Sequence, residues 1–173
     1  FNIGDDAARR EVGNYNFPFA VVFTLFYRLG GRALGWNINA FVSLWLTYLF
    51  TWLWLRRYVR SDRLAGTAAL LAISLPFTWV MLLGGSPAGP AMAWVPLLLL
   101  GADMAVRDGR VAGGAAAALA LLFAWWGDTH VFLFSVLLAP LSVLLPLVAR
   151  DRRWTPRALG RAAFALLPFG AAL

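Results

Sequence analysis

Long apolar stretches, separated by short segments in which arginine is concentrated, dominate this chain. Between the arginine-rich segments lie two connections, residues 84–90 and 127–130, that carry no arginine at all. In multi-span membrane proteins the cytoplasmic loops are rich in basic residues and the loops on the other side are not. The alternation therefore predicts a polytopic membrane protein. Its cytoplasmic loops are predicted at residues 56–63, 107–110 and 150–161.

The composition agrees with lipid as the solvent for most of the chain. Hydrophobic residues make up 61% of the 173 residues and charged residues 13%, whereas a soluble domain is about half apolar and about a quarter charged. A net charge of +7 would indicate nucleic acid as the partner of a soluble protein. Because the arginines flank apolar runs, we expect membrane lipids as partners and no nucleic acid. The chain has no cysteine, which excludes disulfides and thiolate metal sites.

The apolar runs predict an all-α integral membrane protein with about six transmembrane helices. A span needs about 20 mostly apolar residues. The run at 17–32 is shorter and is closed by Arg28 and Arg32, so we expect an interfacial or re-entrant helix there, with a short tilted span as the alternative. The six predicted spans are residues 37–55, 64–83, 91–106, 111–126, 131–149 and 162–173.

Helix breakers and small residues add detail to these spans. Pro76 predicts a kink in the second span, and Pro140 and Pro146 predict interruptions of the fifth. The stretch 111–120, rich in alanine and glycine, predicts close packing against a neighbouring helix.

The chain divides into two predicted regions. Residues 1–35 form an extracytoplasmic loop with its interfacial helix, and residues 36–173 form a transmembrane bundle. The chain begins with Phe1 and ends inside an apolar run, so we expect the bundle to be incomplete at both ends.

Two polar segments on the predicted non-cytoplasmic side are candidates for a functional site. Asp5 and Asp6 are adjacent carboxylates that could bind a divalent cation or supply a general base. The alternative is a solvated loop in which one of them caps a short helix. Asp128 and His130 lie in a turn between two spans, where ionisable groups are functional candidates. The alternative is that Asp128 only caps the helix that begins at Thr129.

Other charged residues also carry predictions. Asp103 lies inside an apolar span, four residues before Arg107, so the two are expected to pair on one helix face. Four arginines on the non-cytoplasmic side depart from the charge bias, and their forked hydrogen bonds could hold a phosphate. Contact with anionic headgroups is the alternative. These arginines are Arg9, Arg10, Arg28 and Arg32.

Three stretches resemble segments of the GT-C superfamily of bacterial membrane glycosyltransferases. Residues 84–100, GGSPAGPAMAWVPLLLL, resemble a loop and apolar run of that superfamily that contains tryptophan and proline. Residues 107–130 resemble its short basic loop, following span and small-residue turn. Residues 2–19 resemble the first extracytoplasmic loop, which carries the acidic catalytic residue.

This resemblance implies transfer of a sugar from a polyprenyl-phosphate donor at the outer face of the bacterial inner membrane. Asp5 or Asp6 would deprotonate the acceptor, and both are candidate ligands of a divalent cation. The residues implied in substrate or phosphate binding are Arg9, Arg10, Arg28, Asp128 and His130.

Two other functions fit the same sequence. Nine tryptophans and thirteen phenylalanines also suit a non-catalytic accessory subunit packed against other transmembrane subunits. Such a subunit should tolerate the loss of Asp5 and Asp6. The second alternative is a lipid or solute transporter, which the scarcity of polar residues inside the spans disfavours.

Overall fold

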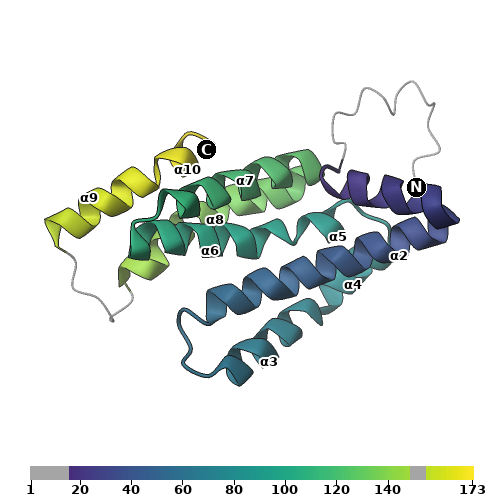
Figure 1. The fold of residues 1–173 in the computed structure, drawn as a ribbon, viewed down its shortest axis with the longest axis horizontal. Coiled ribbons are helices and arrows are strands. Elements are labelled where there is room, and N and C mark those ends of the chain that lie inside the picture. Colours follow the sequence, from purple (N-terminus) through teal and green to yellow (C-terminus); the bar gives the residue numbers. More distant parts are fainter. Residues whose placement is uncertain (1–15, 149–154) are drawn as a thin grey trace.

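The computed structural model describes residues 16–148 and 155–173, and these form helices without strands (Figure 1). The predicted all-α class is confirmed for this part of the chain. The helices are α2 (Phe19–Leu55), α3 (Asp62–Ile73), α4 (Pro76–Leu83), α5 (Ala88–Ala91), α6 (Trp94–Asp108), α7 (Val111–Gly127), α8 (Thr129–Val148), α9 (Pro156–Ala165) and α10 (Leu167–Gly170).

A sharp break at Gly30 and Gly31 divides α2 into two arms that lie against each other. Gly31 has a φ of 77°, which glycine adopts without strain. A Cβ atom on Gly35 would lie 2.9 Å from the carbonyl oxygen of Phe23, so the returning arm touches the first arm through backbone. The arm 32–55 rises about 36 Å at about 1.5 Å per residue, enough for a bilayer core of about 30 Å. The arm 19–29 is too short, and the predicted separation of a short helix from the first span is present.

Among the described residues, three helical segments are long and apolar enough to cross a membrane. They are Phe19–Leu55, Ala88–Asp108 and Thr129–Val148. The pair α3 and α4 makes a fourth when counted as one span bent by 47°. Pro76 is the first residue of α4, so the predicted kink is where proline places it.

The predicted count of six spans is not confirmed. Helix α7 is apolar but has only 17 residues. The predicted last span, 162–173, is divided at Leu166 between the end of α9 and the short α10. The predicted interruptions at Pro140 and Pro146 are wrong, because α8 continues through both residues. Helices inside membranes tolerate proline when neighbouring groups satisfy the freed carbonyl.

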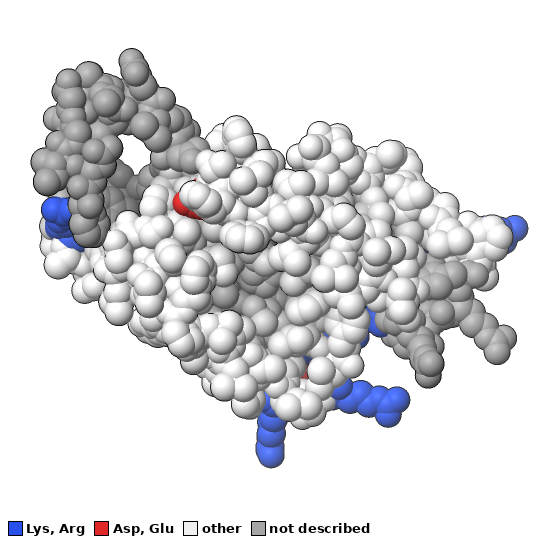
Figure 2. All heavy atoms as spheres, turned by 180° about the vertical axis from the view of Figure 1, so that it is seen from behind, with Lys and Arg blue, Asp and Glu red and all other residues white. Residues whose placement is uncertain are grey.

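The surface of the helices is apolar where lipid would contact it. On the face drawn in Figure 2, most of the surface between the arginine side chains at the edges is uncharged. Helix α8 illustrates this, since large apolar side chains recur along one exposed side at spacings of three and four residues. These are Leu133, Leu137, Leu141, Leu144 and Val148. The fold is therefore compatible with a membrane protein.

Helices α6 and α7 pack with their backbones in contact. A Cβ atom on Gly101 would lie 2.6 Å from the backbone nitrogen of Ala117, and one on Gly113 would lie 2.6 Å from that of Ala105. No real side chain tolerates such distances. The close packing predicted for the alanine- and glycine-rich stretch 111–120 is confirmed, and α6 is the helix against which it packs.

Replacement of Gly101 by valine should separate α6 from α7. We expect a loss of about 1–3 kcal/mol in the free energy of unfolding, the usual effect of overpacking a close contact. Thermal unfolding of the detergent-solubilised protein measures this. Gly160→Ala is the matched control, because a Cβ atom there meets nothing within 4 Å. Equal melting temperatures for the two variants would contradict the contact.

Candidate functional site

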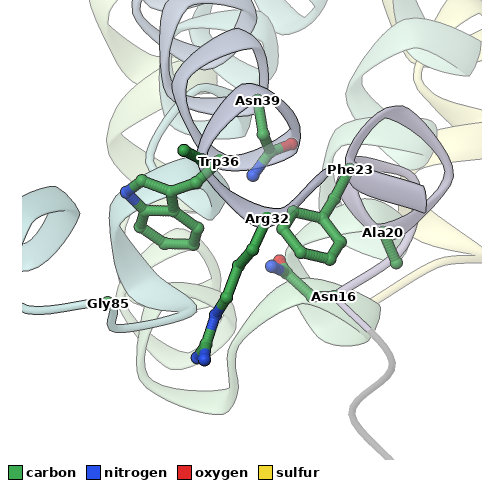
Figure 3. A pocket seen from close by; sticks show the side chains of 8 residues that line it. Asn16, Ala20, Phe23, Arg32, Trp36, Asn39 and Gly85 are labelled. Carbon is green, nitrogen blue, oxygen red and sulfur yellow. The ribbon is translucent and has the colours of Figure 1, made fainter. Parts of the chain in front are cut away.

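A cavity of about 740 Å³ lies beside the break in α2, and we refer to it as the α2 pocket (Figure 3). Both arms of α2 line it, and Gly85 brings the connection between α4 and α5 to its wall. The fold-back at Gly30 and Gly31 therefore creates the pocket from residues close in sequence. The lining residues are Asn16, Ala20, Phe23, Arg32, Ala33, Trp36, Asn39 and Gly85.

The Asn39 side chain is the least expected feature of the pocket wall. Its residue is 2% exposed, and its Oδ1 atom makes no hydrogen bond. Figure 3 shows its amide directed toward the space between Phe23 and Trp36. The Oδ1 atom of Asn16, across the pocket, is also buried without a partner. A buried polar atom left unpaired costs about 1–3 kcal/mol, so a polar partner in the pocket, whether water or a ligand, would stabilise these two oxygens.

Arg32 supplies positive charge at the same place. Its guanidinium extends from the returning arm of α2 alongside Trp36 (Figure 3). Within the described residues, the Arg32 guanidinium forms no ion pair with a carboxylate. A free guanidinium binds phosphate or carboxylate oxygens through paired hydrogen bonds. With Phe23 and Trp36 in its wall, the pocket offers an anion-binding group beside two aromatic rings.

The turn before α8 lies next to this pocket. The Oδ1 atom of Asn16 is 3.9 Å from the position that a Cβ atom on Gly127 would occupy. The ring of Phe17 lies edge-on to that of Trp126, with centroids 5.4 Å apart. The structure thus brings the two arginine-free connections, 84–90 and 127–130, to the end at which α2 is broken.

Asp128 caps α8. Its Oδ1 atom accepts hydrogen bonds from the backbone nitrogens of His130, at 2.9 Å, and Val131, at 3.1 Å. The side chain of His130 is 84% exposed, with Nδ1 3.6 Å from the same oxygen. The capping alternative therefore accounts for Asp128, and neither residue lines the α2 pocket. Their predicted role in substrate binding stays a prediction.

The other predicted site residues fall in two groups. Arg28 is exposed and lines a separate hollow along the first arm of α2, with Ala20 common to both cavities. Among the described residues, no group of three histidine, aspartate or glutamate side chains could hold a metal ion. Asp5, Asp6, Arg9 and Arg10 lie outside the described residues.

Four polar or aromatic lining residues, Asn16, Phe23, Trp36 and Asn39, were not predicted as site residues from the sequence. Asn39 lies within the predicted first span, where an amide is costly unless it is satisfied. That cost is the signal that could have identified it. Trp36 gives no such signal, because tryptophan near a span end is common in membrane proteins.

At the opposite end of α6, Asp103 is fully buried and held by three side chains. It accepts hydrogen bonds from Arg57 Nε and from the Tyr58 hydroxyl, the latter at 2.6 Å. Arg107 Nε lies 3.7 Å away, as the predicted pairing requires. Arg107 also donates to the carbonyl oxygen of Arg57 at 2.8 Å. This Asp103 cluster joins the end of α2 to α6.

The cluster also shifts the pKa of two residues in the connection after α2, Arg57 and Tyr58. Burial and the hydrogen bond to Asp103 raise the pKa of Tyr58. Burial alone would lower the pKa of Arg57, but its hydrogen bonds to Asp108 and Asp103 outweigh that effect and raise it. Tyr58 is therefore held neutral and Arg57 charged, and the cluster acts as a structural tie.

Replacement of Asp103 by asparagine should destabilise the fold strongly. Removal of one partner from a buried ion pair typically costs about 3–5 kcal/mol, because the remaining charge is left uncompensated. The melting temperature in detergent measures the loss. Asp62→Asn is the control, since its ion pair with Arg56 is exposed on both sides and such pairs contribute about 0–1 kcal/mol. A similar loss of melting temperature in the two variants would contradict the stabilising role of the Asp103 cluster.

The raised pKa of Tyr58 predicts a loss of stability at alkaline pH. In the unfolded chain a tyrosine ionises near about pH 10, whereas in the folded chain Tyr58 stays neutral to higher pH. The stabilisation is complete below about pH 10 and is lost as the pH rises from there through the folded pKa. We expect the melting temperature to fall more steeply with rising pH than in Tyr58→Phe, which lacks the ionisable group. Parallel curves would contradict this assignment.

No protein-family model, curated protein or solved structure matches this chain. The α2 pocket and its surroundings therefore carry the functional argument.

Proposed function

We propose that this chain is part of a membrane glycosyltransferase that uses a polyprenyl-phosphate-linked sugar, and that the α2 pocket holds the donor headgroup. The observation that carries this proposal is the combination found in one cavity: an Arg32 guanidinium that pairs with no carboxylate of the described residues, the aromatic rings of Phe23 and Trp36, and two buried amide oxygens without a hydrogen bond. The resemblance of the three sequence stretches to GT-C enzymes supports it.

Each part of the donor has a matching part of the pocket. The Arg32 guanidinium would hold the phosphate through charge-assisted hydrogen bonds. The amides of Asn16 and Asn39 would bond to sugar hydroxyls, and the Trp36 ring would cover the apolar face of the sugar. The polyprenyl chain would follow the exposed apolar residues of the first arm, among them Val21 and Leu25.

The lining residues would bind the donor, but they do not supply a catalytic base, since no carboxylate or histidine is among the described residues that line the pocket. The proposal assigns that role to the predicted acidic loop. Asp5 or Asp6 removes the proton of the acceptor hydroxyl, whose oxygen attacks the anomeric carbon. The bond from that carbon to the phosphate oxygen breaks, and the polyprenyl phosphate leaves with its charge balanced by Arg32.

The arginine distribution supports the orientation that this reaction needs. The predicted cytoplasmic loops 56–63 and 107–110 lie at the end that carries the Asp103 cluster. The α2 pocket lies at the other end, next to connections without arginine. We therefore propose that the pocket opens at the outer face of a bacterial inner membrane.

Binding of a farnesyl-phosphate-linked hexose to the protein in nanodiscs tests the proposal. Arg32→Gln should weaken binding about tenfold, equivalent to about 1.4 kcal/mol, and Asn39→Leu should weaken it as well. Arg63→Gln is the control, because it removes an exposed arginine far along the chain from the pocket. Absence of binding by the unaltered protein, or equal weakening by Arg63→Gln, would contradict the pocket assignment.

Transfer is tested separately from binding. Asp5→Asn and Asp6→Asn should leave hexose-lipid binding intact, and at least one should abolish release of polyprenyl phosphate. If both variants release it at the normal rate, the catalytic assignment is wrong and a non-catalytic accessory role becomes the better account.

A further inference from the structure

A second hollow, of about 680 Å³, lies between α9 and the connection from α6 to α7. It is separate from the α2 pocket in every lining residue, so it is outside the proposed transfer reaction. We refer to it as the α9 hollow. Its lining residues are Gly109, Arg157, Gly160, Arg161 and Phe164.

The two arginines of the hollow come from one face of an amphipathic helix. Arg157 and Arg161 are four residues apart on α9, so their side chains are neighbours on the helix surface. Both are exposed, whereas Ala158, Ala162 and Ala165 are buried against the rest of the fold. Helix α9 therefore lies along the bundle and turns its arginines outward.

Gly109 allows α9 to come close to the end of α6. It ends α6 in the left-handed region, with a φ of 65°. A Cβ atom there would lie 3.1 Å from the Cβ atom of Arg161, so the absence of a side chain brings the stem of Arg161 onto this backbone. The position of Arg161 is thus set by packing, which leaves its guanidinium at the hollow.

The charges of the hollow are not balanced within the described residues. Some of the other arginines at this end have carboxylate partners: Arg56 pairs with Asp62, and Arg57 with Asp103 and Asp108. The described ion pairs include neither Arg157 nor Arg161. Two guanidiniums one helical turn apart, beside a cavity, form a site for an anion with several acceptor oxygens.

Beyond the arginines, the hollow is lined by two glycines and one apolar side chain, and further apolar surface is exposed nearby in the sequence. Phe164 lines it and is 63% exposed, and Leu167, at the start of α10, is 62% exposed. A basic helix with an exposed apolar side is typical of a segment that lies at the membrane surface. Anionic headgroups attract such segments in addition to the apolar contact.

We propose that the α9 hollow binds an anionic phospholipid, with the headgroup phosphate between Arg157 and Arg161 and an acyl chain along Phe164. The lipid would supply the negative charge that the described residues do not, and it would hold α9 against the end of α6. Because the hollow lies at the end of the predicted cytoplasmic loops, the bound lipid belongs to the cytoplasmic leaflet.

Native mass spectrometry of the whole chain, released from an equimolar mixture of phosphatidylglycerol and phosphatidylcholine with identical acyl chains, tests this proposal. The unaltered protein should retain phosphatidylglycerol in preference to phosphatidylcholine. The double variant Arg157→Gln/Arg161→Gln should reduce that preference about tenfold. Arg60→Gln/Arg63→Gln is the matched control, because it removes the same charge from exposed residues near the Asp103 cluster that line none of the described cavities.

A lysine double variant, Arg157→Lys/Arg161→Lys, keeps the proposal testable if the glutamine variant does not fold. It keeps the charge and should retain more phosphatidylglycerol than the glutamine variant does. Equal loss in the glutamine variant and its matched control would show general charge attraction and overturn the site. Displacement of the lipid by millimolar inorganic phosphate would also overturn the lipid assignment, since it would identify a site for a soluble phosphate.

Discussion

Backbone atoms of α6 and α7 approach each other so closely at Gly101 and Gly113 that neither position has room for a side chain. This contact makes α6 the central helix, against which α2, α7, α8 and α9 all pack. Residues near the two ends of α6 make the contacts that hold α2 in place. Trp94, at its first residue, packs between the rings of Phe19 and Phe123, and Asp103, near its last, holds the end of α2.

The two ends of the bundle treat polar groups in opposite ways. Around Asp103, the carboxylate, the guanidiniums and the tyrosine hydroxyl satisfy one another, so the cluster needs nothing further. In the α2 pocket, the oxygens of Asn16 and Asn39 are buried and unpaired, and Arg32 is without a described carboxylate. A polar group that is satisfied stabilises the fold, and one that is buried without a partner has room for a water or a ligand. This contrast separates the end that the Asp103 cluster holds together from the end at which we propose the site.

Local signals in the sequence predicted the features that depend on neighbouring residues. The short apolar run ended by Arg28 and Arg32 predicted the division of α2, and Pro76 predicted the bend before α4. The spacing of Asp103 and Arg107 predicted their pairing within one helix. Arg57 could not be predicted as a partner of Asp103, because 46 residues separate them and only the packing of α2 on α6 brings them together.

The same limit applies to the spans and to the candidate site. Apolar composition predicted six spans, but a run such as α7 can be apolar and still be shorter than a bilayer requires. Arg32 was recognised as a possible phosphate ligand, whereas Asn39 and Trp36 became part of a site only through the fold-back of α2. The sequence pattern predicted the helical class and the breaks in α2 and before α4, whereas the cavity arises from how two arms of one helix meet.

The break at Gly30 and Gly31 has a consequence for the thermodynamics of binding. A ligand in the α2 pocket would touch residues on both sides of the break, such as Phe23 and Asn39, and would bridge two covalently joined arms. Its affinity then depends on how closely the empty pocket already has the bound shape, as well as on the contacts made. The backbone contact of Gly35 with Phe23 holds the arms together before any ligand arrives. The width of the site is thus set by the break at Gly30 and Gly31 and by the backbone contact of Gly35, and these three glycines have no side chain that could contact a ligand.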